Sequence, residues 1–442
     1  MKKHLIEKYA KPVPRYTSYP SAPHFHSGVT HLDYSEWLKS IDTGKPVSLY
    51  LHVPFCEELC WFCGCNTKIT KQYAPIKKYV ALLKREIEMV RRTLEGQVDV
   101  SHIHWGGGSP TLLKDDDFEL LMQTLRSAFN VLPDAEIAVE IDPRTLSQSL
   151  VKAFGRAGVT RASLGVQDFS QDVQKAINRY QPFDMVKKAV DALRVEGIKA
   201  INFDLIYGLP HQTVGKVVET AKLAVALNPD RLSVFGYAHV PWMKTHMRLI
   251  KDETLPDIFD RYEQSQAIAE TLKEGGYAHI GLDHFAKPGD SLVHAASNHK
   301  LRRNFQGYTT DTAEALIGLG VSSISGLPAG YSQNHTSMHQ YAAAIEEGTF
   351  AISKGIALEP ADIIDRRIIE QFMCNLEVDT LTLSRAGKLP FALLRPMEED
   401  GLIKISDDKI EITPEGRPFM RHVCAAFDRY FGDNKARHSV AV

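Results

Sequence analysis

The sequence predicts an α/β protein in which a partial (β/α)6, TIM-like barrel is followed by a smaller, mainly helical, winged-helix-like domain. Three observations support this prediction. Short β-rich runs alternate with longer helical patterns from residue 47 onward, polar residues end successive strands, and the pattern changes near residue 350. Such alternation is typical of parallel βαβ units, and 442 residues are enough for two or three domains.

The barrel prediction depends on the regular spacing of the strand patterns. We predict strands at 47–53, 100–105, 135–141, 161–166, 200–206 and 231–237, with a seventh at 278–282. Apolar residues recur at helical spacing between them, as at 76–94 and 118–129. Asp115 to Asp117 stand at the start of the second of these helices, where the helix dipole favours anions. Six or seven successive units favour a full or partial barrel over a flat, doubly wound sheet.

We predict three parts of the chain: an N-terminal extension at 1–40, the barrel at 41–350 and a C-terminal domain at 351–442. Within the last part, 355–378 has a helical pattern. The segments 401–405 and 409–412 read as two paired strands that precede a final helix. This order indicates a small winged-helix module. A lid or packing role is favoured over DNA binding, because no basic stripe accompanies it.

The charge balance of the chain narrows the classes of partner. Lys and Arg number 52 and Asp and Glu 54, a formal net charge of -2. We therefore expect neither nucleic acid nor a membrane surface as a partner. No apolar run approaches membrane-spanning length, and the first residues lack the apolar segment of a signal peptide. We expect a monomeric, cytoplasmic protein whose cysteines are reduced.

Four of the six cysteines lie within ten residues, at Cys56, Cys60, Cys63 and Cys65. Thiols at this density hold a soft metal or an inorganic cluster. Structural zinc sites usually add a second Cys/His pair further along the chain, and none stands out here. The spacing C-x3-C-x2-C instead supplies three thiolates, enough for three irons of a [4Fe–4S] cluster. The spacing favours the cluster and leaves zinc as the alternative.

Polar residues end several of the predicted strands. Glu140 ends the third strand, Gln167 follows the fourth, and Asp204 lies within the fifth. The cysteine loop follows the first strand, and the glycine run 106–108 ends the second. One such residue would usually be a satisfied strand-end polar group. Because barrel chemistry sits at the carboxyl ends of the strands, several of them together predict one shared site.

The motif that begins at Tyr50 and His52 and continues through Cys56, Cys60 and Cys63 resembles that of the radical S-adenosylmethionine (SAM) enzymes. More narrowly, the chain resembles the oxygen-independent coproporphyrinogen III oxidases of bacterial haem biosynthesis. The further matching segments are 14–20, 104–111, 165–169, 204–210, 237–241 and 304–308. The cysteine motif is specific to the superfamily and the full set to the family, and the resemblance covers nearly the whole chain. It implies a partial barrel of the radical SAM type.

The resemblance also implies roles for individual residues. Cys56, Cys60 and Cys63 would hold a [4Fe–4S] cluster, and its fourth iron would bind SAM. The SAM contacts would be Tyr50, Phe62, Gly107, Gly108, Ser109, Glu140, Gln167, Arg179, Asp204, Ala238 and Ile324. Ser109 stands where the family usually has Thr, and it keeps the hydroxyl. Tyr50, His52 and Cys65 are associated with substrate turnover, and Cys65 must leave the fourth iron open.

The implied reaction is oxidative decarboxylation of the ring A and B propionates of coproporphyrinogen III to vinyl groups. The product is protoporphyrinogen IX. Two propionates imply two SAM molecules per turnover, together with an electron donor and an acceptor that the sequence does not identify. The substrate carries four carboxylates, so basic and hydrogen-bonding groups must converge on its pocket. The candidates are Arg15, His284, Arg303, Phe305 and Gln306, although Arg302 and Arg303 also fit a plain surface pair.

Three alternatives share part of this pattern. A haem chaperone on the same fold generally lacks the segment 15–20 and the fourth cysteine, and this chain has both. A haem-degrading radical SAM paralogue is the second alternative, and a zinc-stabilised barrel is the third. The stiff segment from Pro14 to Pro20 precedes the barrel, so we expect it to cover the substrate at the barrel mouth. A strap on the barrel exterior is the other interpretation of that segment.

Overall fold

A computed structural model describes residues 3–384 and 389–432, and a 12-stranded sheet lies at its centre. Six strands in chain order are neighbours in this sheet and are parallel. They are β1 (Val47–Val53), β4 (Asp99–Gly107), β5 (Asn130–Ile141), β6 (Arg161–Gln167), β7 (Ala200–Tyr207) and β8 (Arg231–Gly236). The predicted partial (β/α)6 barrel is therefore confirmed, with β5 starting five residues earlier than expected.

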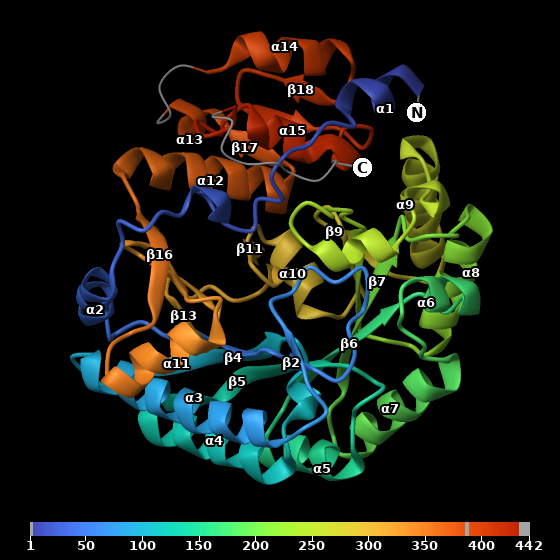
Figure 1. Cartoon of the computed structure of the whole chain (residues 1–442). Coiled ribbons are helices and arrows are strands. Elements are labelled where there is room, and N and C mark those ends of the chain that lie inside the picture. The colour runs from blue at the N-terminus through green and yellow to red at the C-terminus, as the bar shows by residue number, and fades with distance from the viewer. Residues whose placement is uncertain (1–2, 385–388, 433–442) are drawn as a thin grey trace.

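Helices cover the outer face of this curved sheet (Figure 1). They are α3 (Ala74–Thr93), α4 (Asp115–Ala128), α5 (Gln148–Ala157), α7 (Phe183–Val195), α8 (Val214–Ala226) and α9 (Ile258–Glu274). Their apolar sides pack against the outer face of the strands. In β6, for example, buried residues alternate with half-exposed ones that face the inside of the barrel. The fully buried Trp105 of β4 shows the packing, since its ring centroid lies 4.9 Å from that of Phe118 on α4.

The sheet continues beyond both ends of the six-stranded series. On one side β13 (Leu316–Leu319) runs parallel to β1, and three antiparallel strands follow it. These are β14 (Ile324–Leu327), β15 (Gly330–Asn334) and β16 (Ile352–Ala357). On the other side β10 (His284–Ala286) and β9 (Ala278–Ile280) are antiparallel. The strand predicted at 278–282 exists as the edge strand β9, but β10 separates it from β8, because the short 281–283 turn reverses the chain.

The shorter elements lie mainly around the carboxyl ends of the strands. β2 (Phe55–Cys56) pairs in parallel with β3 (Lys68–Ile69), and β11 (Arg302–Asn304) forms a hairpin with β12 (Gly307–Thr309). The helices are α2 (His31–Lys39), α6 (Gln171–Ala176), α10 (Ser291–Ser297) and α11 (Met338–Glu347). Single 3-10 turns lie at Ala22–His24, Pro110–Leu112, Thr245–Leu249, Asp252–Thr254 and Arg417–Phe419.

The C-terminal domain contains helices and a three-stranded antiparallel sheet in the order β17-β19-β18. Its elements are α12 (Pro360–Asn375), β17 (Glu377–Asp379), α13 (Thr380–Ser384), α14 (Phe391–Glu399), β18 (Ile403–Ile405), β19 (Lys409–Ile412) and α15 (Met420–Ala425). The predicted hairpin is present. The helix predicted at 355–378 is shorter, because Gly355 pairs with Ser332 in the barrel sheet and Pro360 starts the helix. The winged-helix interpretation stays a prediction.

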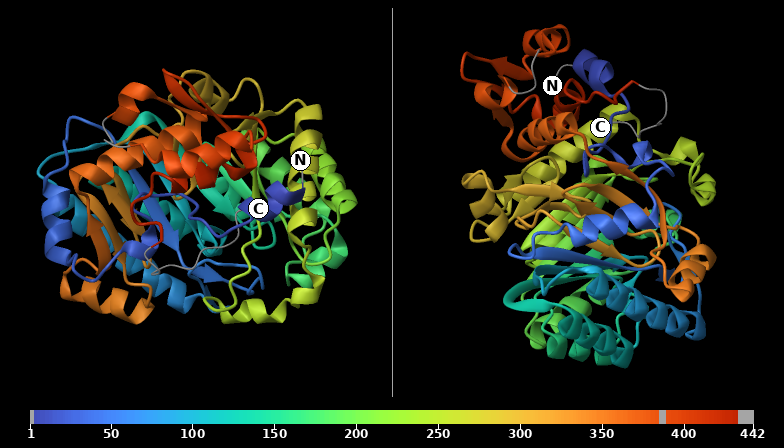
Figure 2. Two further views of the ribbon diagram at one scale, coloured as in Figure 1. Left: turned by 90° about the horizontal axis from the view of Figure 1, so that it is seen from above. Right: turned by 90° about the vertical axis from the view of Figure 1, so that its left-hand side faces the viewer.

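The N-terminal segment packs against the C-terminal domain. Helix α1 (Lys3–Tyr9) lies beside that domain in all three views (Figures 1 and 2). Leu5, Ile6 and Tyr9 are buried in one apolar cluster with residues such as Phe372 of α12 and Met420 of α15. Helix α2 belongs instead to the barrel core. The domain boundaries stay predictions, and parts of the predicted domains, 1–2, 385–388 and 433–442, lie outside the described residues. No helix in the described ranges is long and apolar enough to cross a membrane.

The packing of α1 predicts that Ile6→Ala will destabilise the C-terminal domain. Ile6 is 4% exposed, and truncating a buried Ile to Ala costs about 2–5 kcal/mol. Thermal unfolding should show an earlier transition. Leu32→Ala is the matched control, because Leu32 is 66% exposed, and it should change stability by less than about 0.5 kcal/mol. Equal transition temperatures for the two variants would contradict the packing of α1.

Candidate active site

A cavity of about 440 Å³ opens at the carboxyl ends of the parallel strands and extends through the barrel as far as Ser48, Arg161 and Arg231. It collects residues that are far apart in the sequence, as the barrel interpretation requires. The predicted site residues on its wall are Cys56, Cys60, Phe62, Cys63, Cys65, Gly107, Gly108, Ser109, Glu140, Gln167, Arg179, Asp204, His284, Phe305 and Gln306. The fourth thiol, Cys65, lines the same cavity as the other three.

The cysteine loop is fixed at both ends and along its length. Strand β2 places Cys56 next to β3, and Thr67 donates from Oγ1 to Cys56 Sγ at 3.2 Å. Further along, the Trp61 amide donates to the Ile177 carbonyl at 2.9 Å. The Cys65 amide donates to Cys63 Sγ at 3.4 Å. The three thiols of the motif are therefore presented to the cavity by a loop that the surrounding backbone holds in place.

Two arginines and one aspartate surround Cys60. Arg144 donates from Nη2 to Cys60 Sγ at 3.4 Å and Arg179 from Nη1 at 3.5 Å. Both also bind Asp142, with Nη–Oδ2 distances of 2.7 and 3.2 Å. Burial raises the pKa of Asp142, but the two guanidiniums outweigh it and hold that pKa at about 2. Two guanidinium groups therefore hold the Cys60 sulfur at the cavity wall.

The donors suit a cluster better than a single ion. Within residues 3–384 and 389–432, no three His, Cys, Asp or Glu side chains are placed to hold one metal ion together. A structural zinc site needs such convergence. A cluster distributes its thiolates over several irons, which three cysteines around one cavity can provide.

Two glycines bring the second strand against the cysteine loop. Gly107 has φ +117°, and a Cβ there would lie 2.8 Å from the His52 ring. A Cβ at Gly108 would lie 2.7 Å from the Phe55 carbonyl oxygen and 2.8 Å from the Phe55 amide nitrogen. Backbone atoms cannot yield as a flexible side chain can, so only glycine fits beside β2 at this position. The glycine run therefore positions the cysteine loop as well as the cavity wall.

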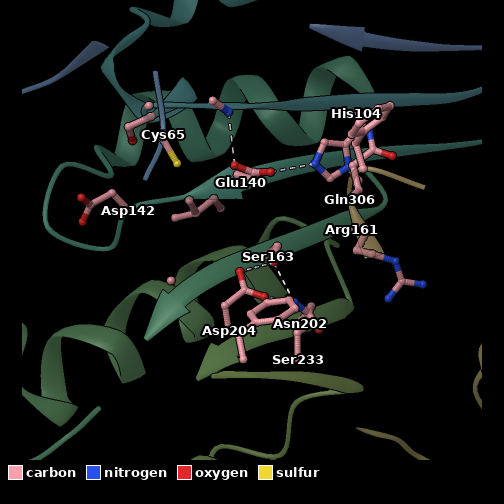
Figure 3. Close-up of a pocket in the computed structure, with 18 of the residues that line it drawn as sticks. Cys65, His104, Glu140, Asp142, Arg161, Ser163, Asn202, Asp204, Ser233 and Gln306 are labelled. Carbon is pink, nitrogen blue, oxygen red and sulfur yellow. Dashed lines mark hydrogen bonds and ion pairs between the residues drawn. The ribbon is translucent and has the colours of Figure 1, made fainter. Parts of the chain in front are cut away.

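Carboxylates from β5 and β7 face the cavity (Figure 3). Glu140 accepts from His104 Nε2 at 3.0 Å and from the Gly107 amide at 3.3 Å. Asp204 accepts from Ser163 Oγ and from Asn202 Nδ2, both at 3.0 Å. Burial, reinforced by the charge of Glu140, raises the pKa of Asp204. Both carboxylates still have acceptor capacity for hydroxyl or amino groups of a ligand.

Gln167 has an unusual backbone conformation. It ends β6 with φ +65°, which is uncommon for a residue with a side chain. A Cβ at the neighbouring Gly165 would lie 2.7 Å from Gln167 Nε2 and 3.0 Å from Arg179 Nη2. Arg179 Nη2 also donates to the Gly165 carbonyl at 2.8 Å. Strained residues of this kind cluster at binding sites, which supports a ligand contact at Gln167.

Tyr50 and His52 lie behind the glycine run and do not line the cavity. His52 Nε2 donates to the Asn66 carbonyl at 3.0 Å, so its Nδ1 accepts from the Tyr50 hydroxyl at 3.0 Å. Burial lowers the pKa of His52 and raises that of Tyr50 well above its usual value. The pair is therefore neutral near pH 7, and the Tyr50 ring stacks on His104, with centroids 5.9 Å apart.

Four other predicted residues also lie outside this cavity. Arg15 and Arg303 line a second cavity beside it. Ile324 packs in an apolar cluster with Phe305. Ala238 follows β8 and is partly buried. The structure thus brings most of the predicted SAM contacts together but leaves Tyr50, Ala238 and Ile324 outside the cavity wall.

Three residues of the site were missed from the sequence. His104, Thr67 and Arg144 hold Glu140, Cys56 and Cys60 respectively. His104 and Arg144 could have been found from the sequence. His104 lies within a predicted strand and Arg144 just after one, and each falls on the alternate positions that face the cavity. Thr67 carries none, since its place depends on how the cysteine loop folds back.

The barrel and its cysteine loop define a radical SAM protein. The sequence model of the radical SAM superfamily matches residues 50–224, the segment that carries the loop and most of the parallel strands.

Comparison with known proteins identifies the family within the radical SAM superfamily. A protein from Bradyrhizobium diazoefficiens named oxygen-independent coproporphyrinogen III oxidase is 48% identical over 97% of this chain and 97% of its own length. A protein of the same name from Paracoccus denitrificans is 41% identical, covering 95% and 94%. The solved structure of coproporphyrinogen III oxidase (HemN) from Escherichia coli, a radical SAM enzyme, matches with a TM-score of 0.91 at 38% identity, covering 97% and 99%. The chain belongs to the family of oxygen-independent coproporphyrinogen III oxidases.

The surroundings of Gly108 and Gly64 predict that alanine at the first position lowers the iron content and that alanine at the second does not. Gly108→Ala places a Cβ against the Phe55 backbone and should displace β2, which lowers the iron content after anaerobic reconstitution. Gly64→Ala is the matched control, because a Cβ at Gly64 meets nothing within 4 Å. It should leave the iron content unchanged. Full iron content in the Gly108 variant would show that β2 does not depend on this contact.

Proposed function

We propose that the protein catalyses the oxidative decarboxylation of the ring A and B propionates of coproporphyrinogen III, which yields protoporphyrinogen IX. The observation that carries the proposal is the convergence of three thiols, the glycine run and strand-end carboxylates on one cavity, in a chain of this family. The alternatives of a haem chaperone, a haem-degrading paralogue and a zinc-stabilised barrel find no support in the relatives.

Cys56, Cys60 and Cys63 would hold the cluster. Arg144 and Arg179 donate to the Cys60 sulfur, and Thr67 donates to that of Cys56. Cys65 shares the cavity and would keep its thiol free for turnover. When bound, the reduced cluster and SAM supply the one-electron chemistry that removes a hydrogen atom from a propionate β-carbon.

SAM would extend from the cysteine loop across the strand ends. Glu140 can accept from its amino group, Arg179 can bind its carboxylate, and Asp204 can accept from the ribose hydroxyls. Gly107, Gly108 and Ser109 line the same wall. Phe62 supplies a flat apolar surface. The contacts implied by the family also include Tyr50, Gln167, Ala238 and Ile324. Of these four, Gln167 lies on the cavity wall.

The substrate would enter beside the hairpin of β11 and β12. Its turn places Phe305 and Gln306 on the wall of the cavity. His284 lies beside the hairpin, with its ring centroid 5.2 Å from that of Tyr308 and its Nδ1 2.8 Å from Asp283. Loss of the β-hydrogen, departure of CO2 and transfer of one electron to an acceptor convert each propionate to a vinyl group. Two such events use two SAM molecules. Tyr50 and His52 act in turnover by holding the wall behind Gly107, while the electron donor and acceptor are separate partners.

An anaerobic assay tests the proposed function. The reconstituted protein, with coproporphyrinogen III, SAM and a one-electron reductant, should form a divinyl product and release two molecules of CO2 per substrate. Mass spectrometry of the oxidised porphyrin would identify the product. In parallel, Cys56→Ser should lose iron and activity, whereas Cys65→Ser should keep its iron and lose turnover. Reductive SAM cleavage with no loss of carboxylate from the substrate would contradict the proposal.

Asp204 offers a separate test of the SAM position. Asp204→Ala removes an acceptor and leaves Ser163 and Asn202 facing the ligand, so SAM binding should weaken by roughly 1–3 kcal/mol. Equilibrium dialysis with labelled SAM measures this change, and the absorption spectrum of the cluster should be unaffected. Asp172→Ala is a suitable control, because Asp172 is an exposed residue of α6 that is paired with Lys216. If both variants bind SAM equally well, Asp204 does not contact the ligand.

A further inference from the structure

A second cavity, of about 600 Å³, lies between the barrel and the C-terminal domain. The ends of β7 and β8, helix α9 and the β9–β10 turn form one side. Residues 411–421 of the C-terminal domain form the other. Phe305 and Gln306 line both this cavity and the first one. The turn of the β11–β12 hairpin is therefore a wall that the two cavities share.

Arginines from separate segments of the chain converge on this second cavity. The five residues are Arg15, Arg261, Arg303, Arg417 and Arg421. They come from the N-terminal segment, helix α9, strand β11, the 3-10 turn after β19 and helix α15. We call this set the arginine cluster. Such a set is costly to bring together in a partly buried space, because like charges repel and burial removes water.

Backbone carbonyls orient three of these guanidiniums. Arg15 donates to the Gly236 carbonyl at 3.1 Å and Arg261 to the Tyr237 carbonyl at 2.9 Å. Arg417 donates to the carbonyls of Gly281 and His279 at 2.6 and 2.9 Å. A carbonyl fixes the direction of a guanidinium but carries no formal charge to neutralise it. These bonds therefore fix the directions of the three guanidiniums.

Arg303 is a deeply buried member of the arginine cluster, since its side chain is only 5% exposed. Its Nη1 lies 3.7 Å from Asp283 Oδ1, and its guanidinium lies 4.5 Å from the centroid of the Tyr308 ring. Its Nε is buried and has no hydrogen-bond partner in the described part of the chain. A buried donor of this kind calls for an acceptor that a ligand can bring.

The acidic residues of the wall also bind basic groups outside the arginine cluster. Glu377 and Glu411 line the cavity, but Lys409 binds both, at 2.6 and 3.4 Å. Asp283 is shared between Arg303 and His284. Burial lowers the pKa of Arg417 and of Arg421 to about 10, and the charge of Arg15 adds to the effect at Arg421. The cavity is thus built to receive negative charge.

We propose that the arginine cluster binds the two propionates of rings C and D, which the reaction leaves intact, while the ring being processed lies beyond Phe305 and Gln306 in the first cavity. The inference rests on the proposed function. In the type III isomer these two propionates flank the same bridging carbon, so both point to one side of the macrocycle. One cavity can therefore hold them together, through bidentate bonds that suit guanidinium and carboxylate.

This arrangement makes the arginine cluster a determinant of isomer specificity. In the type I isomer propionates and methyl groups alternate around the ring, and no two propionates flank one bridging carbon. That isomer can present only one carboxylate to the cavity in the same pose. The arginines of the C-terminal domain would therefore select the substrate by the placement of propionates that do not react. These propionates would lie away from the [4Fe–4S] cluster and SAM.

The test uses the stable porphyrins, coproporphyrin III and coproporphyrin I, in fluorescence titrations of the reconstituted protein. Arg417→Gln and Arg15→Gln should each weaken the binding of coproporphyrin III roughly tenfold, the change expected from one lost charge-assisted hydrogen bond. They should weaken coproporphyrin I less, so that the preference for isomer III falls. Arg417→Lys and Arg15→Lys keep the charge and should recover part of the affinity.

Arg367→Gln is the matched control, because Arg367 is an exposed residue of α12 in the same domain. It should change neither affinity nor turnover, and iron content and thermal unfolding report whether each variant is folded. Equal loss for both isomers, or affinities like that of the control, would overturn the inference. Competition by inorganic phosphate as strong as that by coproporphyrin would likewise overturn it, since it would indicate a simple anion site. A wild-type protein without decarboxylase activity would instead count against the proposed function.

Discussion

The ion network of Asp142, Arg144 and Arg179 is the interaction on which the site depends. Asp142 follows β5, Arg144 lies two residues later, and Arg179 follows α6, so the network joins two strand-end loops. Both arginines also reach Cys60. Burying three charges is costly, and their geometry here does more for position than for stability. Without Asp142, two buried cations beside Cys60 would repel each other, and the loops that frame the cysteines would separate.

The glycine run works with this network from the opposite side. Gly108 brings β4 within contact of the Phe55 backbone, and Gly107 makes room for the His52 ring. The cysteine loop is thus confined between β4 and the two arginines. Because the loop has two independent restraints, its three thiols keep a fixed orientation before any cofactor binds. Preorganised ligands of this kind lower the entropy that is lost when the cofactor binds.

The sequence was sufficient to predict the parts of the fold that depend on local periodicity. The strands from Val47 to Gly236 follow apolar runs, and their carboxyl ends share an edge by the geometry of parallel sheets. The insertion of the antiparallel β10 between β8 and β9 was not predictable, because it depends on a three-residue turn that the strand pattern does not reveal. The burial of α1 in the C-terminal domain was also beyond reach, since residues 5 and 372 meet only through tertiary packing.

The same distinction applies to the site. Glu140, Gln167 and Asp204 follow from strand ends, and the structure places them on one wall. Arg144 lies next to a predicted strand end, yet its role appears only when Cys60 is beside it. Ala238 and Ile324 came from the family resemblance, and they lie outside the cavity wall because loops and edge strands set their positions. The sequence periodicity cannot predict a site residue whose role depends on two distant segments that fold together.

The β11–β12 hairpin links the two halves of the molecule. Its Tyr308 hydroxyl accepts from the Leu282 amide of the barrel at 3.0 Å and donates to the Met373 carbonyl of α12 at 2.7 Å. Arg302 adds an ion pair with Glu370 of α12 at 3.0 Å. The hairpin turn is also the wall between the two cavities. A shift of the C-terminal domain would therefore move Phe305 and Gln306 relative to the cysteine loop. The domain that supplies Arg417 and Arg421 thus also sets the position of the wall against which the substrate would lie.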